Sequence, residues 1–240
     1  MLSPLFKLVV TFAALAVLGR MSEAGPPFLT DDPEPVDYRH WEFYLASSWE
    51  FHHAESDATM PHIEINYGAV PDVQLHLIAP MELVKQGSAQ LYGYSDTELG
   101  VKFRVVQEKG GTPQIGIFPM VELPTGDQSH GLGNGTTRLF LPVWLQKSWG
   151  KMTTYGGAGY WYNPGTGNKN WLLAGWEAQY DISPVFTLGG EIFYHTRQTD
   201  GGQSGTGFNL GGHHHLLLSA GHSLTGETST TLYLSYQITT

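Results

Sequence analysis

The chain has 240 residues, of which only 14% are charged, and it contains 30 glycines and no cysteine. The lack of cysteine excludes a disulfide framework and thiol chemistry. A formal net charge of −10 argues against a nucleic-acid partner, because phosphate binding needs clustered lysine and arginine.

Residues 1–24 are typical of an export signal. Lys7 precedes the apolar run LVVTFAALAVL at 8–18, which is too short to cross a bilayer as a helix. SEA at 22–24 then places small residues at the two positions that signal peptidase reads. We predict cleavage after Ala24; the alternative is an uncleaved N-terminal anchor helix.

The next segment, GPPFLTDDPEPVDY at 25–38, is rich in proline and acid, so we do not expect a regular strand there. It would form either a tail in the periplasm or a plug inside a barrel. We predict insertion, in which Asp31 and Asp32 would pair with Lys102, Arg104 or Arg138.

Residues 39–240 alternate between apolar and polar positions and show no convincing helix. In WLLAGWEAQYDI at 171–182, for example, Leu172 and Trp176 share one face while Glu177 lies on the other. A period of two is typical of a strand with unlike faces. Twelve such segments are predicted, at 39–52, 59–68, 72–85, 95–107, 113–123, 137–149, 151–162, 170–181, 185–197, 206–212, 214–223 and 229–239.

The connections alternate between long and short. The odd-numbered ones are long and polar: HAESDA, QGSAQLYGY, PTGDQSHGLGNGTT, NPGTGNKN, QTDGGQSG and LTGETS. Those between them are mostly short: AVPD, EKGGT, GK, DISP and HH. Outer-membrane barrels have short periplasmic turns and long outer loops, and an even strand count places both ends in the periplasm. We therefore predict an all-β fold: a single closed antiparallel transmembrane barrel of about twelve strands, an up-and-down meander over 39–240.

The apolar face of these strands carries almost no charge, so it predicts contact with outer-membrane lipids. Aromatic side chains gather near strand ends, where girdles form at the headgroups: Trp41, Trp49, Trp149, Tyr180 and Tyr194. The alternative is a secreted soluble sandwich or barrel whose apolar faces pack on one another. Lipid-facing and subunit-facing strands have the same pattern, so the sequence predicts no oligomeric state.

The opposite face would line the lumen with charged side chains. They could form a structural network across the barrel or a polar path that selects a solute, and we expect most to be structural. The candidates are Glu64, Glu82, Glu98, Lys102, Arg104, Glu122, Arg138, Glu177, Glu191 and Arg197, with Glu42 and Glu50 on the same face.

Several motifs that suggest other chemistry fail on inspection. PTGDQSHGLGNGTT at 124–137 lacks the GK[ST] ending and the following helix of a phosphate loop. GGHHHLLLSAGHS at 211–223 reads as a periplasmic turn formed by Gly211 and Gly212, followed by a strand with His215, Leu217 and Ser219 inward. A metal site would need three or four converging ligands, so we predict neither metal nor cofactor.

An enzymatic alternative is a lipid hydrolase that uses Ser219 or Ser223 with His195 or His222. A nucleophile needs a base within hydrogen-bond reach and a third group that orients it. Sequence spacing shows none of these relations, so we predict a protein that is not an enzyme. An adhesion or structural barrel is a further alternative.

The mature chain resembles the meta-pathway phenol-degradation family of transporter-like outer-membrane barrels. The resemblance rests on AGPPFLTDDPEPVDYRHWEFYL, DTELGVKFR, FPMVELPTGD, LPVWLQKSWG, TYGGAGYWYNPG, FNLGG and HHLLLSAGHSL, in this order. It implies a channel or transporter for a small hydrophobic or aromatic solute, and it supplies no catalytic or binding residues.

Overall fold

The computed structural model describes residues 26–240 apart from 54, 87, 166–167, 197–198 and 227. Strands make up most of it, as the alternating pattern predicts. They are β1 (Trp41–Phe51), β2 (Glu55–Val70), β3 (Val73–Gln86), β4 (Ala89–Tyr94), β5 (Thr97–Val106), β6 (Gln114–Ile117), β7 (Met120–Leu123), β8 (Arg138–Trp149), β9 (Met152–Tyr162), β10 (Trp171–Ser183), β11 (Phe186–His195), β12 (Thr199–Gly211), β13 (His214–Gly226) and β14 (Thr230–Thr239). A short 3-10 helix, Gln128–His130, lies in the loop after β7. Within the described ranges, no helix is long and apolar enough to cross a bilayer.

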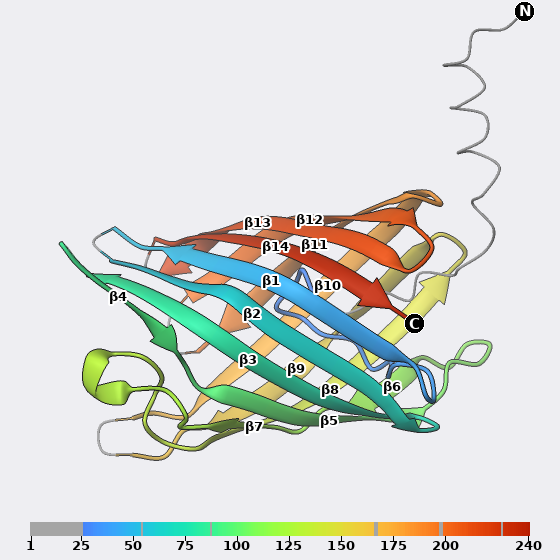
Figure 1. Cartoon of the computed structure of the whole chain (residues 1–240). Coiled ribbons are helices and arrows are strands. Elements are labelled where there is room, and N and C mark those ends of the chain that lie inside the picture. The colour runs from blue at the N-terminus through green and yellow to red at the C-terminus, as the bar shows by residue number, and fades with distance from the viewer. Residues whose placement is uncertain (1–25, 54, 87, 166–167, 197–198, 227) are drawn as a thin grey trace, which may run out of the picture.

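The strands form one closed antiparallel barrel of twelve spanning strands, which confirms the predicted fold (Figure 1). β4 and β5 together make one spanning strand, because both pair with β3. β6 and β7 make another, since both pair with β5 and β8. Pro119 lies at their junction, where proline has no N–H to give to the sheet. Pairing of β1 with β14 completes the circle.

The two ends of the barrel differ. One end, the turn end, holds Trp41, Thr239 and tight connections such as Pro71–Asp72, Gly150–Lys151 and Gly212–His213. The other end, the loop end, holds the long loop 124–137 and the described parts of the connection between β9 and β10, 163–165 and 168–170, as predicted. At the β12–β13 turn, Gly211 and Gly212 take φ angles of 100° and 61°, which suit glycine.

Three of the predicted long connections are wrong, because they are largely strand. Residues 55–58 belong to β2, 89–94 to β4 and 199–205 to β12, which begins seven residues before the predicted segment at 206. Glycine and serine in 199–205 indicated a turn. These residues instead pair with β11 and β13, and Gly205 on the inner wall leaves room for the N-terminal segment. These hairpins therefore continue as paired strands beyond the alternating segments that the sequence predicts.

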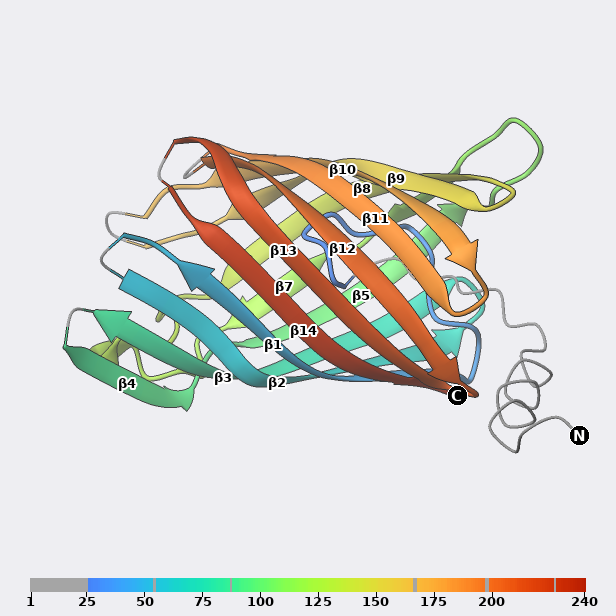
Figure 2. The same cartoon turned by 90° about the horizontal axis from the view of Figure 1, so that it is seen from above.

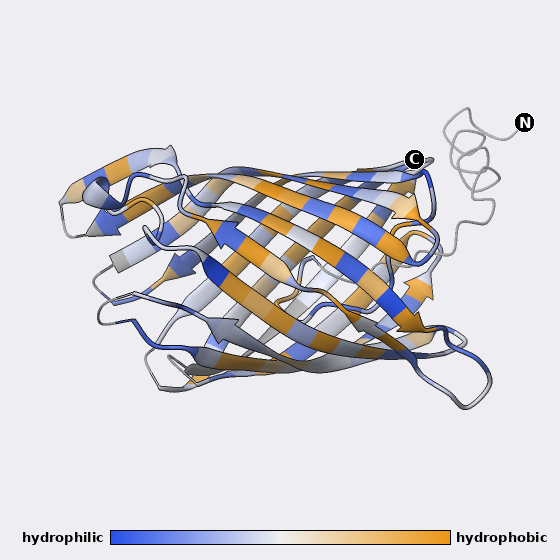
Figure 3. Cartoon of the chain, turned by 90° about the horizontal axis from the view of Figure 1, so that it is seen from below, coloured by the Kyte–Doolittle hydropathy of each residue, from blue (hydrophilic) through white to orange (hydrophobic). Residues whose placement is uncertain are grey.

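The two faces of the barrel have the predicted polarity. Apolar residues alternate along the strands in Figure 3, and large ones such as Ile192, Leu141 and Tyr180 are exposed on the outside. Of the predicted girdle residues, Trp41, Trp149, Tyr180 and Tyr194 are also exposed. Buried polar residues such as Glu64 and Gln237 share the opposite face. The lumen is therefore where functional polar groups gather.

Asp72 fixes the β2–β3 turn and makes it sensitive to pH. It has a φ of 64°, and its Oδ1 accepts hydrogen bonds from Gln107 Nε2 at 3.0 Å and Arg104 Nε at 2.7 Å. The bonds from Gln107 and Arg104 hold the pKa of Asp72 below its ordinary value. A lowered carboxyl pKa stabilises the fold above the ordinary value, and this stability is lost as pH falls through the lowered one.

Replacing Asp72 by asparagine, which tolerates positive φ, should therefore lower the free energy of unfolding by about 0.5–1 kcal/mol at neutral pH. The difference should disappear in strong acid, where the wild-type carboxyl is protonated. Urea unfolding in lipid vesicles at both pH values measures this. An equal difference at both would mean that the backbone, and not the charge, is responsible.

Candidate functional site

The N-terminal segment 26–38 lies inside the barrel (Figure 2). It starts from the turn end, where Arg39 N donates to Gly68 O at 2.7 Å, and Val36 N donates to Gln74 Oε1 of β3 at 2.9 Å. At its other end, Ser219 Oγ of β13 donates to Pro27 O at 2.7 Å. The segment therefore crosses the lumen from the wall of β2 and β3 to that of β13.

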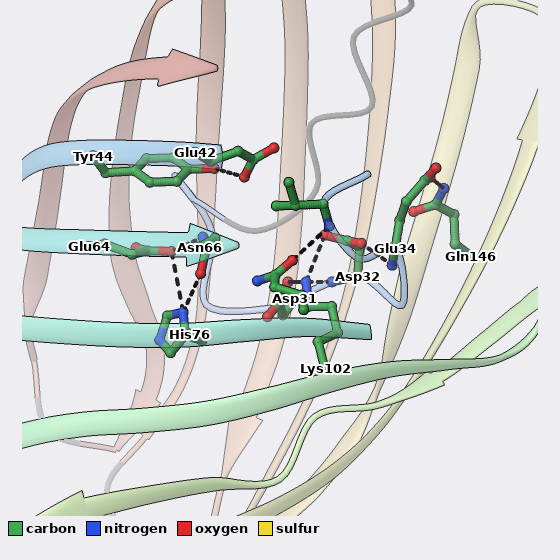
Figure 4. A network of polar contacts seen from close by, with 12 residues as sticks. Asp31, Asp32, Glu34, Glu42, Tyr44, Glu64, Asn66, His76, Lys102 and Gln146 are labelled. Carbon is green, nitrogen blue, oxygen red and sulfur yellow. Dashed lines mark hydrogen bonds and ion pairs between the residues drawn. The ribbon is translucent and has the colours of Figure 1, made fainter. Parts of the chain in front are cut away.

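An ion-pair cluster anchors the middle of this segment. Lys102 of β5 is almost fully buried, and its Nζ lies 3.0 Å from Asp31 Oδ1 and 3.4 Å from Asp32 Oδ2 (Figure 4). Burial raises the pKa of Asp32 well above its ordinary value, and the charge of Lys102 opposes that rise. Arg104 reaches Glu34 at 3.5 Å. Of the three bases predicted to pair with Asp31 or Asp32, only Lys102 does so.

A second anchor is made by a carboxylate that accepts backbone N–H groups. Glu191 of β11 accepts from Leu29 N and Thr30 N, each at 2.8 Å. Amides of a segment without secondary structure must find partners when buried, and this carboxylate supplies two. Glu191 is thus a docking residue for the N-terminal segment.

Glycines on the inner wall mark the path of the segment. A Cβ added to Gly68 would lie 1.9 Å from Asp37 O, and one added to Gly116 would lie 2.8 Å from Pro33 Cα. The same holds for Gly175, beside Thr30, and for Gly189 and Gly205, beside Phe28. At Gly68 and Gly116 the close atoms are backbone of the segment, so only glycine at these two positions admits the segment in this place; at the other three the close atoms belong to side chains.

Other predicted lumen residues form a network on β2, β3 and β5 (Figure 4). His76 Nδ1 lies 2.6 Å from Asn66 Oδ1, and its Nε2 lies 3.1 Å from Glu98 Oε1. Asn66 Nδ2 donates to Glu64 Oε1 at 2.8 Å. Each polar group here has a protein partner, which suits the predicted structural network.

At the loop end, acids hold the loop 124–137. Glu82 Oε2 accepts from Gly133 N at 3.1 Å, and Asp96 Oδ1 accepts from Gly126 N at 3.0 Å. Glu122 forms an ion pair with Arg138, so Arg138 is not available to Asp31. Leu132 of the loop is buried beside Gly93. The loop is therefore folded against the inner side of β4.

The lumen also has an apolar part, which the sequence reasoning missed. Phe118, Phe140, Trp144, Trp161 and Trp171 form an aromatic layer on the inner wall: Phe140 stacks on Trp161 at 4.8 Å, and Trp161 on Trp171 at 5.1 Å. The Arg138 guanidinium lies 5.3 Å from the Trp161 ring, within cation–π range. The alternation along β8 could have indicated this layer, because Phe140 and Trp144 share the parity of Arg138 and Gln146.

Two of the predicted lumen residues, Glu177 and Arg197, belong to none of these clusters. Glu177 is fully buried on the inner face of β10, whereas Arg197 lies outside the described residues.

The histidine stretch occupies the β12–β13 turn, with His215, Leu217 and Ser219 buried inside as predicted. In the described part of the chain, no three His, Asp or Glu residues are grouped to hold a metal.

The serines proposed for hydrolysis have other partners. Ser219 Oγ donates to Pro27 O, Ser223 Oγ accepts from Ser229 N at 2.9 Å, and His222 Nδ1 lies 3.1 Å from Thr230 Oγ1. Neither of these serines is hydrogen-bonded to a histidine among the residues that the structure covers. The arrangement of a nucleophile with its base is therefore not formed.

Comparison with solved structures places the barrel among known folds. It is similar to the COG4313 outer membrane channel from Pseudomonas putida F1, with a TM-score of 0.66 and 14% identity over 91% of this chain and 100% of that one. The fold is that of an outer-membrane β-barrel. The KdgM porin in complex with disordered oligogalacturonate has a TM-score of 0.57 and 9% identity over 81% of this chain and 98% of its own. The translocator domain of the autotransporter NalP from Neisseria meningitidis has a TM-score of 0.57 and 10% identity over 97% and 93%.

No protein-family model and no curated protein matches the sequence. At identities this low, the structural likeness establishes the fold of the barrel and not the solute of the protein.

Proposed function

We propose that the protein is an outer-membrane channel or transporter for a small hydrophobic or aromatic solute. The observation that carries this proposal is the aromatic layer inside the lumen. Trp161 is only partly buried there, and its ring stacks between Phe140 and Trp171. Binding sites for small hydrophobic ligands are lined mainly by apolar and aromatic side chains, so an aromatic layer on the inner wall supports an apolar passenger.

Two further features support the proposal. The similar structures include one described as an outer membrane channel and one as a porin. The sequence resembles the phenol-degradation family of transporter-like barrels, which agrees with an aromatic solute. We propose that export to the outer membrane proceeds through cleavage after Ala24, and that segment 26–38 then acts as a plug in the lumen.

Solute uptake tests the proposal. Replacing Trp161 by alanine should slow the uptake of toluene, used as the probe, by about tenfold, because a lost aromatic contact removes about 1.4 kcal/mol. Uptake is measured in cells that lack other channels for the probe. Trp149→Ala, which removes an exposed tryptophan of the outer face, is the matched control and should leave uptake unchanged.

If neither the wild type nor Trp161→Ala takes up the probe above the empty-vector level, and the purified protein conducts no ions, the proposal fails. A structural or adhesion barrel would then be the better description. A lipid hydrolase would instead release fatty acid from phospholipid vesicles, and this can be measured on the same preparation.

A further inference from the structure

The N-terminal segment places one aromatic ring against a bare part of the inner wall. Phe28 lies over Gly189 of β11 and Gly205 of β12, which are paired directly in register. A Cβ added to Gly189 would stand 3.0 Å from Phe28 Cζ, and one added to Gly205 would stand 2.8 Å from it. Glycine inside a strand often marks a place where another group approaches closely. We call this position of the Phe28 ring the ring seat.

The ring seat has the lining of a small apolar binding site. Tyr155 of β9 and Leu217 of β13 border it, and each of them is only 1% exposed. Gln179 and Thr187 add two polar side chains to the lining. Sites for small ligands combine such apolar and aromatic walls with a few polar groups. Because the paired glycines have no side chains, the backbone beneath the ring is flat and suits a planar molecule.

The seat is full while Phe28 occupies it. The free volume beside the ring is about 10 Å³, which is about the space that one water molecule needs. A second ring can therefore enter only if the Phe28 ring leaves. The backbone on both sides is anchored, since Pro27 O accepts from Ser219 Oγ at 2.7 Å and Leu29 N donates to Glu191 at 2.8 Å. The Phe28 side chain can thus rotate away while the segment stays docked.

The ring seat lies on the same wall as the aromatic layer and nearer to the turn end. Trp161 and Tyr155 are both on the inner face of β9, six residues apart, which is about 20 Å along a strand. Trp161 is close to the loop that follows β9, whereas Tyr155 is close to Met152 at the turn end. A solute that passes the aromatic layer from the loop end meets the ring seat before it reaches the turn end.

We propose that the ring seat is a second binding site for an aromatic solute, and that Phe28 is the ligand that the chain itself supplies when no solute is bound. The solute and the Phe28 ring compete for the same glycine floor. Binding of the solute displaces the ring, while Glu191 and Lys102 keep the segment in the lumen. This inference rests on the proposed function and adds that the solute competes with a residue of the plug.

NMR of the Phe28 ring measures this competition in the folded barrel. The protein is isotope-labelled at Cζ of its phenylalanines and held in lipid nanodiscs, and the Phe28 signal is the one that Phe28→Leu lacks. On titration with toluene, the probe, we expect this signal to move and then saturate near its position in Gly205→Ala, where the added Cβ pushes the ring off its seat. Gly111→Ala, with nothing within 4 Å of its Cβ, should leave the signal in place.

Removal of the Phe28 ring should strengthen toluene binding. The methyl signals of Leu217, which lines the same recess, should reach half-saturation in Phe28→Ala at about one tenth of the wild-type toluene concentration, because toluene no longer has to displace the ring. Leu29→Ala is the matched control: it removes a neighbouring side chain that is 49% exposed, and it should bind toluene as the wild type does. Methylcyclohexane, which is similar in size but not planar, should bind several-fold more weakly.

Three results would overturn the inference. One is a Phe28 signal that toluene leaves in place, or that drifts without saturation as the signal of Phe51 on the outer face does. Another is equal half-saturation in the wild type and Phe28→Ala, because toluene and the ring would then not compete. The third is equal binding of methylcyclohexane and toluene, since the seat would then not select a planar ring.

Toluene uptake by Trp161→Ala is a separate measurement, so the two proposals can fail independently. Uptake that depends on Trp161, together with an unresponsive Phe28 signal, would keep the channel function and remove the ring seat. A saturable Phe28 response in a barrel that takes up no toluene would keep the ring seat as a binding site and remove the channel function.

Discussion

Replacing Lys102 by methionine should release the N-terminal segment and raise the single-channel conductance of the barrel in planar bilayers. The lysine is almost fully buried and binds both Asp31 and Asp32, so its loss leaves a buried acid without its cation. Breaking one side of such a pair costs about 3–5 kcal/mol. We expect a comparable fall in the free energy of unfolding, measured by urea in lipid vesicles.

The double variant Lys102→Met/Asp32→Asn is the matched control. It removes the most buried acid together with the base, so it should recover part of the lost free energy of unfolding. Its conductance should fall part of the way back to that of the wild type. A chain lacking residues 26–36 provides the conductance of an empty lumen. If Lys102→Met and this deletion both conducted as the wild type does, the segment would not be a plug.

Alanine at Gly68 or at Gly116 should also open the lumen, although it changes no charge. The added Cβ would meet Asp37 O at 1.9 Å or Pro33 Cα at 2.8 Å, and these are backbone atoms of the segment that cannot rotate away. The segment must therefore shift, and conductance should rise toward that of the deleted chain. Single-channel recording in planar bilayers measures the change.

Gly111→Ala is the control for this pair, because nothing lies within 4 Å of the position of its Cβ. It should leave conductance unchanged. All three variants should keep the heat-modifiable migration of a folded barrel. A rise in Gly111→Ala equal to that in the other two would mean that the effect arises from glycine loss in general and not from contact with the segment.

The sequence predicted the barrel and most of its inner face from one regularity, the period of two. Glu64, Lys102 and Glu191 fall on the buried side because their apolar neighbours must face lipid. The same rule failed at β12, where glycines resemble a turn although they pair within the sheet. Local composition cannot show that an inner position is kept empty for another segment.

Which partner each charge takes could not be predicted from the sequence. Arg138 and Lys102 were equal candidates for Asp31 and Asp32, and the choice depends on strand register and on the path of the segment. In the structure, Arg138 forms an ion pair with Glu122, and Lys102 forms one with Asp31 of the segment. The aromatic layer could not be predicted from polarity alone, because Phe140 and Trp144 share the parity of Arg138 although large apolar side chains also suit contact with lipid.

The position of the segment next to β1 bears on how the barrel is assembled. β1 and β14, the first and last strands, meet along one seam, where Thr240 N donates to Trp41 O at 3.0 Å and Trp41 N donates to Thr240 Oγ1 at 2.8 Å. The segment is joined directly to β1. Because of this link, the segment can be enclosed on the inner side of the sheet when the first strand meets the last, and this route does not require it to thread a finished pore.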